Sequence, residues 1–404
     1  MEDMAMADAF SALRARDEAS VMRTYGRYPL AVSRAQGSRL FDLDGREYVD
    51  LLAGIAVCNL GHCHPEVTEA IRRQAGELVH VSNLFFQREQ VELAERLLAT
   101  CHCGKAFFCN SGAEANEGAI KLARRFMREV RGREAFEIIT LSGSFHGRTL
   151  ATLTATGQDK IKHGFAPLPE GFVTVPFGDL AAVKTAIRPE TAGVLVEIIQ
   201  GEGGVNPLPG DYVRGLAALC RERGILFMVD EIQTGMCRTG RFWAFQHHDV
   251  QPDIFTCAKA LANGLPMGAL LATDEVAAGF VPGSHATTFG GTPLVSAAAA
   301  TVVEVMVRER MDDRARRVGD YAMGLFTDLR QTYPDKIATI RGVGLMIGIE
   351  LTFPGQEVWR ELLDRGFVLN LTQERVLRLL PPLTIPREDL ARFASALGAV
   401  LGEM

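Results

Sequence analysis

The sequence predicts an α/β protein in which helices cover both faces of a mostly parallel sheet. Short apolar runs alternate with helical patterns through the middle of the chain, which is expected for repeated strand–helix units. Most of these runs are continuously apolar instead of alternating with polar residues, which is typical of strands buried on both faces. The expected strands span residues 105–109, 136–141, 172–176, 192–199 and 225–229.

Both ends of the chain differ from this middle region. Residues 39–50 predict a β-hairpin with an Asp-Gly turn, a long Ala/Val-rich helix is expected over residues 293–308, and residues 341–350 predict a glycine-punctuated strand. A chain of 404 residues usually divides into more than one domain. We expect a large α/β domain over residues 61–290. Residues 1–60 are then expected to join a smaller α+β domain with residues 291–404, which begin with the linking helix.

Composition narrows the classes of function. Hydrophobic residues make up 47% and charged residues 23% of the chain, which is ordinary for a globular protein. The net charge of −6 argues against general nucleic-acid binding. We see no signal-peptide pattern and no apolar stretch of roughly 20 residues that could span a membrane. The expectation is therefore a cytoplasmic protein with neither nucleic-acid nor membrane partners.

Eight cysteines without an export signal are expected to be reduced thiols. Two short motifs, His62-Cys63-His64 and Cys101-His102-Cys103, raise the question of a metal. Their spacing differs from the usual zinc patterns, in which paired ligands are separated by about two to four residues. We therefore expect no metal site, and Pro65 after the first motif indicates a turn that enters a helix.

Two apolar runs end in residues with complementary chemistry. Residues 225–229 lead to Asp230, and residues 252–258 lead to Lys259. A lysine amine can form a Schiff base with an aldehyde, and a carboxylate can keep a pyridine nitrogen protonated. Either residue alone would be an ordinary charge at a strand end, but the pair predicts a pyridoxal phosphate site.

A segment of small residues precedes a helix that is expected from about residue 113 to residue 128. Ser111 and the two residues after it would let backbone amides approach an anion such as phosphate. Ser111 and Glu114 also match a capping box, and the two interpretations are compatible. Phe145 could lie flat against a cofactor ring, and Arg148 could bind a carboxylate. Taken alone, Phe145 would be a core residue and Arg148 a solvated charge.

Together, these motifs resemble the class III aminotransferases of the fold-type I pyridoxal phosphate enzymes. The matching segments include residues 24–29, 60–65, 82–86, 110–116, 145–149, 230–235 and 378–383. The resemblance implies a seven-stranded large-domain sheet, a small domain built from both chain ends, and a homodimer with shared active sites. One departure is Thr292, which stands where many relatives have asparagine.

The resemblance also implies the residues that bind the cofactor. These are Ser111, Gly112, Ala113, Phe145, Asp230, Gln233, Lys259 and Thr288. Lys259 would hold the cofactor and move the proton during catalysis, while Asp230 would pair with the pyridine nitrogen and Gln233 with the phenolic oxygen. The residues from Ser111 to Ala113 would bind the phosphate, together with Thr288 of the neighbouring subunit, and Phe145 would stack on the ring.

The implied reaction is a ping-pong transamination of N2-acetylornithine with 2-oxoglutarate in arginine biosynthesis. Arg378 would bind the α-carboxylate of glutamate, and Glu202 would pair with Arg378 when the other donor is bound. Arg148 would bind the remaining substrate carboxylate, and Tyr25 would contact the substrate.

Several alternatives stay open. Ornithine, succinylornithine, succinyl-diaminopimelate and 4-aminobutyrate are alternative donors, because the cofactor residues do not distinguish them. An aminomutase would use the same lysine without an external 2-oxo acid, but the presence of both Arg148 and Arg378 argues against it. The pairing of Asp230 with Lys259 argues against a non-catalytic scaffold. A nicotinamide enzyme is disfavoured because no Gly-x-Gly-x-x-Gly turn opens a helix near the N-terminus.

Overall fold

The computed structural model describes residues 2–404 and contains a seven-stranded sheet in the order β4-β12-β11-β10-β7-β5-β6. Neighbouring strands are parallel except at β12, which runs antiparallel to β4 and β11. The mostly parallel sheet predicted from the sequence is thus confirmed. Its strands are β4 Lys105–Cys109, β5 Glu137–Leu141, β6 Phe172–Val175, β7 Thr191–Val196, β10 Leu226–Asp230, β11 Ile254–Cys257 and β12 Gly268–Ala272.

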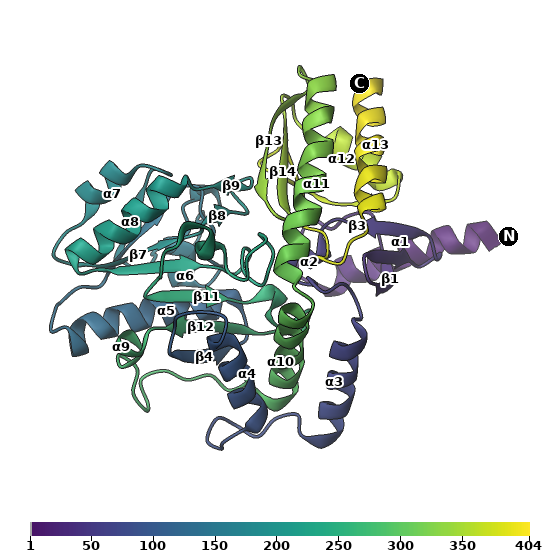
Figure 1. Ribbon diagram of the computed structural model, residues 1–404. Helices are drawn as coiled ribbons and strands as arrows, with labels where there is room; N and C mark the ends of the chain where they lie inside the picture. The colour runs from purple at the N-terminus through teal and green to yellow at the C-terminus, as the bar shows by residue number, and fades with distance from the viewer. Residues whose placement is uncertain (1) are drawn as a thin grey trace.

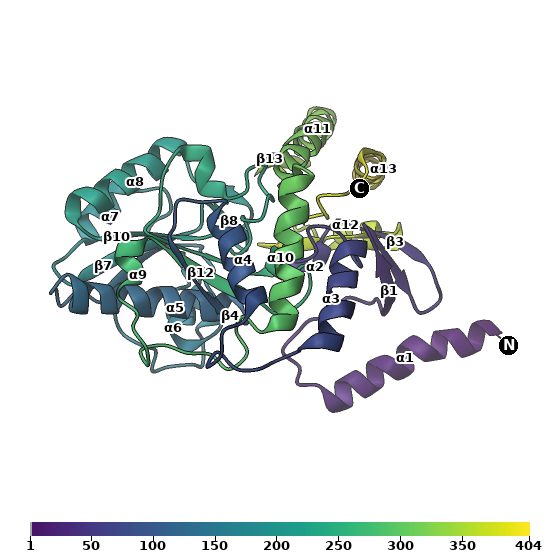
Figure 2. The ribbon, with the colours of Figure 1, turned by 60° about the horizontal axis from the view of Figure 1, so that its bottom comes forward.

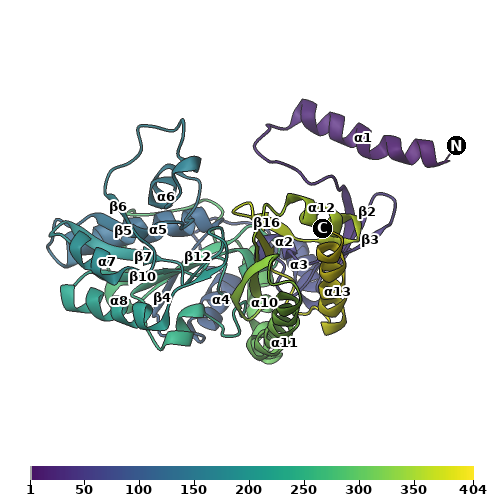
Figure 3. The same ribbon diagram turned by 90° about the horizontal axis from the view of Figure 1, so that it is seen from above.

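Helices cover both faces of this sheet. Figures 2 and 3 show α5 (Gly112–Arg125) and α6 (Leu150–Ala155) on one face, and α4 (Arg88–Leu98) and α8 (Gly210–Arg223) on the other. Every residue of β7 and β10 is buried, because their continuous apolar sequences face helices on both sides. The other elements here are α2 Ala53–Ala56, α3 Pro65–Glu77, η1 Phe126–Val130, η2 Asp159–Ile161, α7 Leu180–Ala186, β8 Ile199–Gln200, β9 Asn206–Pro207, η3 Ala244–His248, η4 Lys259–Ala262 and α9 Asp274–Ala277.

A long helix, α10 (Pro293–Arg308), leads from the large sheet to the rest of the chain (Figure 1). It packs against α3 and α4, and its bounds are those expected from the sequence. Proline at its first position suits a helix start, where the backbone N–H has no partner in the helix. Thr292 is the N-cap residue, but its side chain makes no capping hydrogen bond.

The smaller domain combines both chain ends. A hairpin of β2 (Arg39–Asp42) and β3 (Glu47–Asp50) forms at the predicted Asp-Gly turn, and β3 pairs in parallel with β15 (Phe367–Val368). A second sheet has the order β13-β14-β17-β16. The remaining elements are β1 Val32–Gln36, α11 Met311–Thr332, β13 Ile337–Val343, β14 Met346–Leu351, α12 Gln356–Asp364, β16 Asn370–Thr372, β17 Val376–Leu379 and α13 Arg387–Glu403.

The prediction of one strand over residues 341–350 is wrong, because the chain reverses between β13 and β14. Gly344, at the reversal, has a φ of +59°, which glycine adopts readily. A Cβ atom at this position would also lie 2.5 Å from the carbonyl carbon of Thr239. The apolar residues on the two sides of Gly344 therefore belong to two strands, the partly buried β13 and the mostly buried β14.

Helix α1 (Glu2–Ser20) extends away from the rest of the chain (Figures 2 and 3). Among residues 2–404, no helix combines the length and apolar character needed to cross a membrane. The domain boundaries at residues 60 and 290 stay a prediction.

Candidate active site

A cavity of about 430 Å³ opens where the parallel strands of the large sheet end. Ligands of open α/β sheets usually bind outside the carboxyl ends of the strands. The cavity is lined by these residues singled out from the sequence: Ser111, Gly112, Ala113, Phe145, Arg148, Glu202, Asp230, Gln233 and Lys259. Arg378 lies directly behind this lining, where it contacts Glu202.

Lys259 follows β11 and begins the short segment η4. Its φ is +46°, a left-handed conformation that is uncommon for a residue with a side chain and often marks functional sites. Burial lowers the pKa of Lys259, although the negative charge of Glu202 partly opposes this effect. A lowered pKa increases the share of neutral amine, which is the form that attacks an aldehyde or accepts a proton.

Asp230 ends β10 and is only 4% exposed. Its Oδ2 atom accepts hydrogen bonds from Asn116 Nδ2 and His146 Nδ1, both at 2.8 Å. Its Oδ1 atom accepts from the backbone N–H of Ile232 at 3.0 Å. Asn116 is itself fixed, because its Oδ1 atom accepts a hydrogen bond from Thr256 Oγ1 at 2.7 Å. These donors hold the carboxylate in one orientation at the cavity.

Asn116 and His146 lie within the matching segments 110–116 and 145–149, but sequence reasoning gave them no role. Both side chains are buried against Asp230, and this contact is what identifies them as site residues. The sequence alone does not reveal the contact, because it joins segments that are distant along the chain. Glu197 is also buried here, where its Oε2 atom accepts from the Phe145 backbone N–H at 3.0 Å. Burial raises the pKa of Glu197 to about 7, although the nearby His146 charge opposes the increase.

Ser111 is the N-cap residue of α5, and its Oγ atom accepts from the Glu114 N–H at 3.2 Å. The predicted capping box is only half formed, because the Glu114 carboxylate accepts from the Asn110 N–H at 2.7 Å instead of returning to Ser111. Among the described residues, the backbone N–H groups of Ser111, Gly112 and Ala113 have no acceptor. A helix start with free N–H groups is suited to bind an anion.

Gly112 allows a close approach at this helix start. A Cβ atom on Gly112 would lie 2.8 Å from Ile232 Cδ1, so a larger residue would disturb the wall between the helix start and the strand-end carboxylate. The cavity therefore combines an anion cradle, a buried carboxylate and a lysine amine. This set of groups fits the phosphate, the ring nitrogen and the aldehyde of pyridoxal phosphate.

Glu202 and Arg378 form an ion pair, with Arg378 Nη1 donating to Glu202 Oε1 at 2.6 Å. Arg378 is 1% exposed, so Glu202 supplies the negative charge that balances a buried guanidinium. Gln233 bridges the pair, because it donates to Glu202 Oε1 and accepts from Arg378 Nη1, both at 3.3 Å. Burial raises the pKa of Glu202, but the charge and hydrogen bond of Arg378, together with Lys259 and Gln233, lower this pKa on balance.

The remaining predicted residues lie further out. Arg148 is exposed at the cavity, with its guanidinium carbon 5.6 Å from the centre of the Phe145 ring. Tyr25 is 75% exposed and lies beside α1, away from this cavity. Thr288 is exposed and does not line the cavity of its own chain. The single chain therefore does not bring Tyr25 or Thr288 to the other site residues, and their roles stay predictions.

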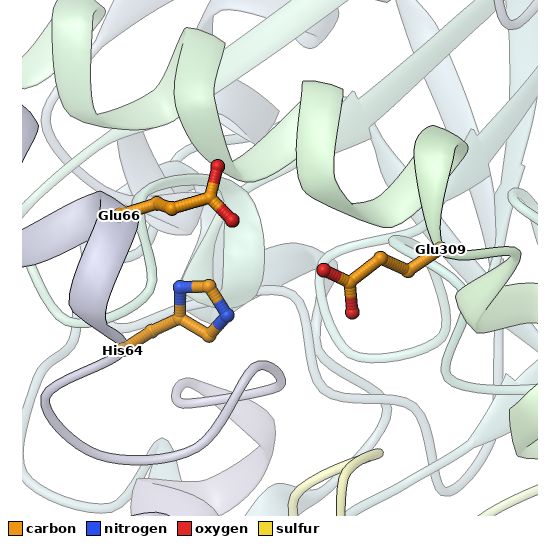
Figure 4. A group of neighbouring side chains, drawn as sticks. All are labelled: His64, Glu66 and Glu309. Carbon is orange, nitrogen blue, oxygen red and sulfur yellow. The ribbon is translucent and has the colours of Figure 1, made fainter.

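A second group of candidate ligands consists of His64, Glu66 and Glu309. Figure 4 shows their side chains converging from the start of α3 and the end of α10. Arg308 already pairs with both carboxylates, at 2.5 Å from Glu66 and 3.1 Å from Glu309. Exposed carboxylates that share an arginine form an ordinary surface ion-pair network, so this group does not support a metal site.

His62 and His102, one from each Cys/His motif, have structural partners. His62 Nε2 donates to Asp50 Oδ2 at 2.7 Å, and this hydrogen bond raises the pKa of His62 to about 10. His102 Nε2 lies 2.8 Å from the carbonyl oxygen of Pro252. These hydrogen bonds give His62 and His102 structural roles within the fold.

Comparisons with known proteins agree with this site. The family described as "Aminotransferase class-III" matches residues 20–401. Acetylornithine aminotransferase from Methanocaldococcus jannaschii is 46% identical, over 95% of this chain and 96% of its own. The acetylornithine aminotransferase from Myxococcus xanthus is also 46% identical, over 92% of each chain.

Solved structures give the same result. An ornithine aminotransferase from Toxoplasma gondii has a TM-score of 0.94 and 33% identity, covering 98% of this chain and 96% of that one. An acetylornithine aminotransferase from Elizabethkingia anophelis has a TM-score of 0.87 and 30% identity, covering 98% and 99%. The chain therefore belongs to the class III aminotransferases, which depend on pyridoxal phosphate.

Proposed function

We propose that this aminotransferase moves the side-chain amino group of N2-acetylornithine to 2-oxoglutarate, which yields N-acetylglutamate 5-semialdehyde and glutamate. This is a step of arginine biosynthesis. The two acetylornithine aminotransferases at 46% identity over nearly their full lengths support the choice of donor. The single structural observation that carries the proposal is the Glu202–Arg378 ion pair beside Lys259.

That ion pair suits an enzyme with two unlike donors. Glutamate brings a carboxylate next to its reacting amine, whereas acetylornithine reacts at the far end of its side chain, where it has no carboxylate. In the proposal, Arg378 binds the α-carboxylate of glutamate after Glu202 moves aside. Glu202 pairs with Arg378 again when acetylornithine is bound, so that the buried arginine always has an anionic partner.

At the mouth of the cavity, Arg148 is proposed to bind the other carboxylate of either substrate. Its exposed guanidinium is free of ion pairs among the described residues, which leaves it available to a substrate. Tyr25 is proposed as a further substrate contact, supported only by its place in the N-terminal motif.

The cofactor residues are proposed from the same geometry. When bound, pyridoxal phosphate supplies an aldehyde that accepts the amino group and a protonated ring that withdraws electrons from the reacting carbon. Lys259 would hold the aldehyde and then carry the proton, a task that its lowered pKa favours. Asp230 would pair with the ring nitrogen, and Gln233 would hydrogen-bond the phenolic oxygen. Phe145, at the cavity wall, would stack on the ring.

The phosphate is proposed to bind the free N–H groups at the start of α5. These belong to Ser111, Gly112 and Ala113. Thr288 of the partner subunit would add a hydroxyl to this anion site. That assignment explains why Thr288 lies outside the cavity of its own chain.

We further propose that the active enzyme is a homodimer. Leu84, Phe85, Phe86 and Phe289 are large apolar side chains that are exposed in the single chain. Their loops are joined, because Asn83 Nδ2 donates to the carbonyl oxygen of Gly290 at 3.0 Å. Exposed apolar patches of this kind often mark protein interfaces. Light scattering should give twice the mass of one chain; a monomeric active enzyme would contradict this part.

The cytoplasm is the proposed location of the enzyme. The described structure holds eight free cysteines, five of which are buried in the fold. A reducing compartment would keep these thiols in that state.

A panel of amino donors tests the reaction. Acetylornithine, succinylornithine, ornithine, succinyl-diaminopimelate and 4-aminobutyrate would each be assayed with 2-oxoglutarate, and kcat/KM compared. The proposal expects acetylornithine to give the highest value. A value about tenfold higher for ornithine or 4-aminobutyrate would contradict the donor. Turnover without any 2-oxo acid would favour an aminomutase.

A further inference from the structure

Asn370 lies directly across the small-domain sheet from Arg378. The two residues are paired in the antiparallel register of β16 and β17, so their side chains point to the same face of the sheet. On the other side of Arg378, the paired residue is Gly348, which has no side chain to hold the guanidinium. Asn370 is therefore the cross-strand neighbour that can fix this arginine.

The contacts of Asn370 determine which way its amide group points. Its Oδ1 atom accepts from two nitrogens along one edge of the Arg378 guanidinium, Nε at 3.1 Å and Nη2 at 2.7 Å. Because arginine has only donors, the amide must turn its oxygen toward Arg378. Its Nδ2 group then donates to the hydroxyl of Tyr28 at 3.2 Å. The Tyr28 ring packs edge-on against Trp359, with ring centroids 4.7 Å apart.

This arrangement leaves the other edge of the guanidinium for carboxylates. Nη1 is the atom that meets Glu202, and a carboxylate binds a guanidinium most strongly through two parallel hydrogen bonds. With Nε held by Asn370, the edge between Nη1 and Nη2 faces the incoming carboxylate. Asn370 is also neutral, so Arg378 needs one negative partner both before and after Glu202 is exchanged for substrate.

We propose that Asn370 is a positioning residue for the dicarboxylate half of the reaction, holding Arg378 by a neutral anchor so that glutamate or 2-oxoglutarate can replace Glu202. This inference rests on the proposed function. An Asn370→Asp substitution would give Arg378 a permanent negative partner at the same position. The arginine would then attract the substrate carboxylate less strongly. The acetylornithine half-reaction, which needs no such exchange, would change little.

Half-reactions of the holoenzyme test this inference. The change in cofactor absorbance would be followed after mixing with glutamate alone or with acetylornithine alone. We expect Asn370→Asp to lower the specificity constant for glutamate by about tenfold or more, and to change that for acetylornithine by less than about twofold. Tyr28→Phe removes only the hydroxyl behind Asn370 and should shift the ratio in the same direction by a smaller factor.

A matched control adds the same charge elsewhere. Gln331 is exposed near the end of α11, so Gln331→Glu should leave both half-reactions unchanged. If Asn370→Asp does not fold, Asn370→Ser keeps a neutral oxygen but shortens its reach, and it must show the same selective loss for glutamate. Equal losses in both half-reactions, or an unchanged reaction with glutamate, would overturn the inference. A wild-type enzyme that does not react with glutamate would instead contradict the proposed function.

Discussion

Replacing Glu202 by glutamine tests the ion pair beside the cavity. The substitution keeps the size of the side chain but removes the charge that competes with a substrate carboxylate for Arg378. At about 4 Å and an effective dielectric constant of about 20, two unit charges attract by roughly 4 kcal/mol. The Glu202 side chain is 30% exposed, and glutamine would still offer a hydrogen-bonding oxygen. We therefore take about 1.4 kcal/mol as the net effect, which corresponds to a tenfold change in affinity.

The substitution should favour 2-oxoglutarate and disfavour acetylornithine. 2-Oxoglutarate no longer has to displace a carboxylate, so it should bind more tightly and its KM should fall about tenfold. Acetylornithine would bind beside a buried arginine without an anionic partner, so its kcat/KM should fall by a similar factor, about tenfold. Steady-state kinetics with both substrates varied would give these constants.

Glu350 supplies the control, because it pairs with Arg341 in the small-domain sheet and lies outside the cavity lining. Glu350→Gln should change neither constant. A Glu202→Gln enzyme in which KM for 2-oxoglutarate rises, or in which both substrates weaken together, would refute the exchange of partners on Arg378.

Two further predictions concern the buried ionisable residues Glu231 and Arg238. Glu231 is 1% exposed, and burial raises its pKa from 4.5 to about 7. The folded state therefore holds this proton more tightly than the unfolded state, and the resulting stability is present below about pH 4.5 and lost as the pH rises toward about 7. Urea titrations at several pH values would measure the unfolding free energy of wild type and of Glu231→Gln. Between about pH 4.5 and about pH 7, wild type should lose up to about 3 kcal/mol relative to the variant. Unfolding free energies that change with pH in the same way in both proteins would contradict this. Arg238 is fully buried and donates to the carbonyl oxygens of Leu345 and Pro381, at 3.0 and 2.6 Å. Arg238→Met leaves these acceptors unpaired and should lower the unfolding free energy by about 2–4 kcal/mol, whereas a loss below about 1 kcal/mol would show that water or rearrangement replaces the contacts.

Local pattern was sufficient for much of the fold. The continuous apolar runs that form β7 and β10 are buried on both faces. The apolar pattern of the sequence therefore predicts the burial of these two strands directly. The helix over residues 293–308 begins at a proline and ends where its apolar pattern stops. Residues 341–350 were harder, because an apolar run interrupted by glycine fits one strand or two. Only the pairing of β13 with β14 decides between these possibilities.

The candidate site was predictable to the extent that its residues follow strands. Parallel strands end at the same edge of a sheet, so Asp230 and Lys259 were expected to lie close together, and both line the cavity. Asn370 carries no such local signal, because its contact with Arg378 depends on the register of a distant sheet. Thr288 depends on a second subunit in the proposal, and a single chain cannot place it.

Chemical trapping tests the proposed role of Lys259 most directly. The purified protein would be incubated with pyridoxal phosphate, reduced with borohydride and digested, and the modified peptide identified by mass spectrometry. We predict a single pyridoxyl group on Lys259, and no modified peptide from Lys259→Ala. Modification of another lysine, or an unmodified Lys259 in protein that binds the cofactor and turns over normally, would contradict the account.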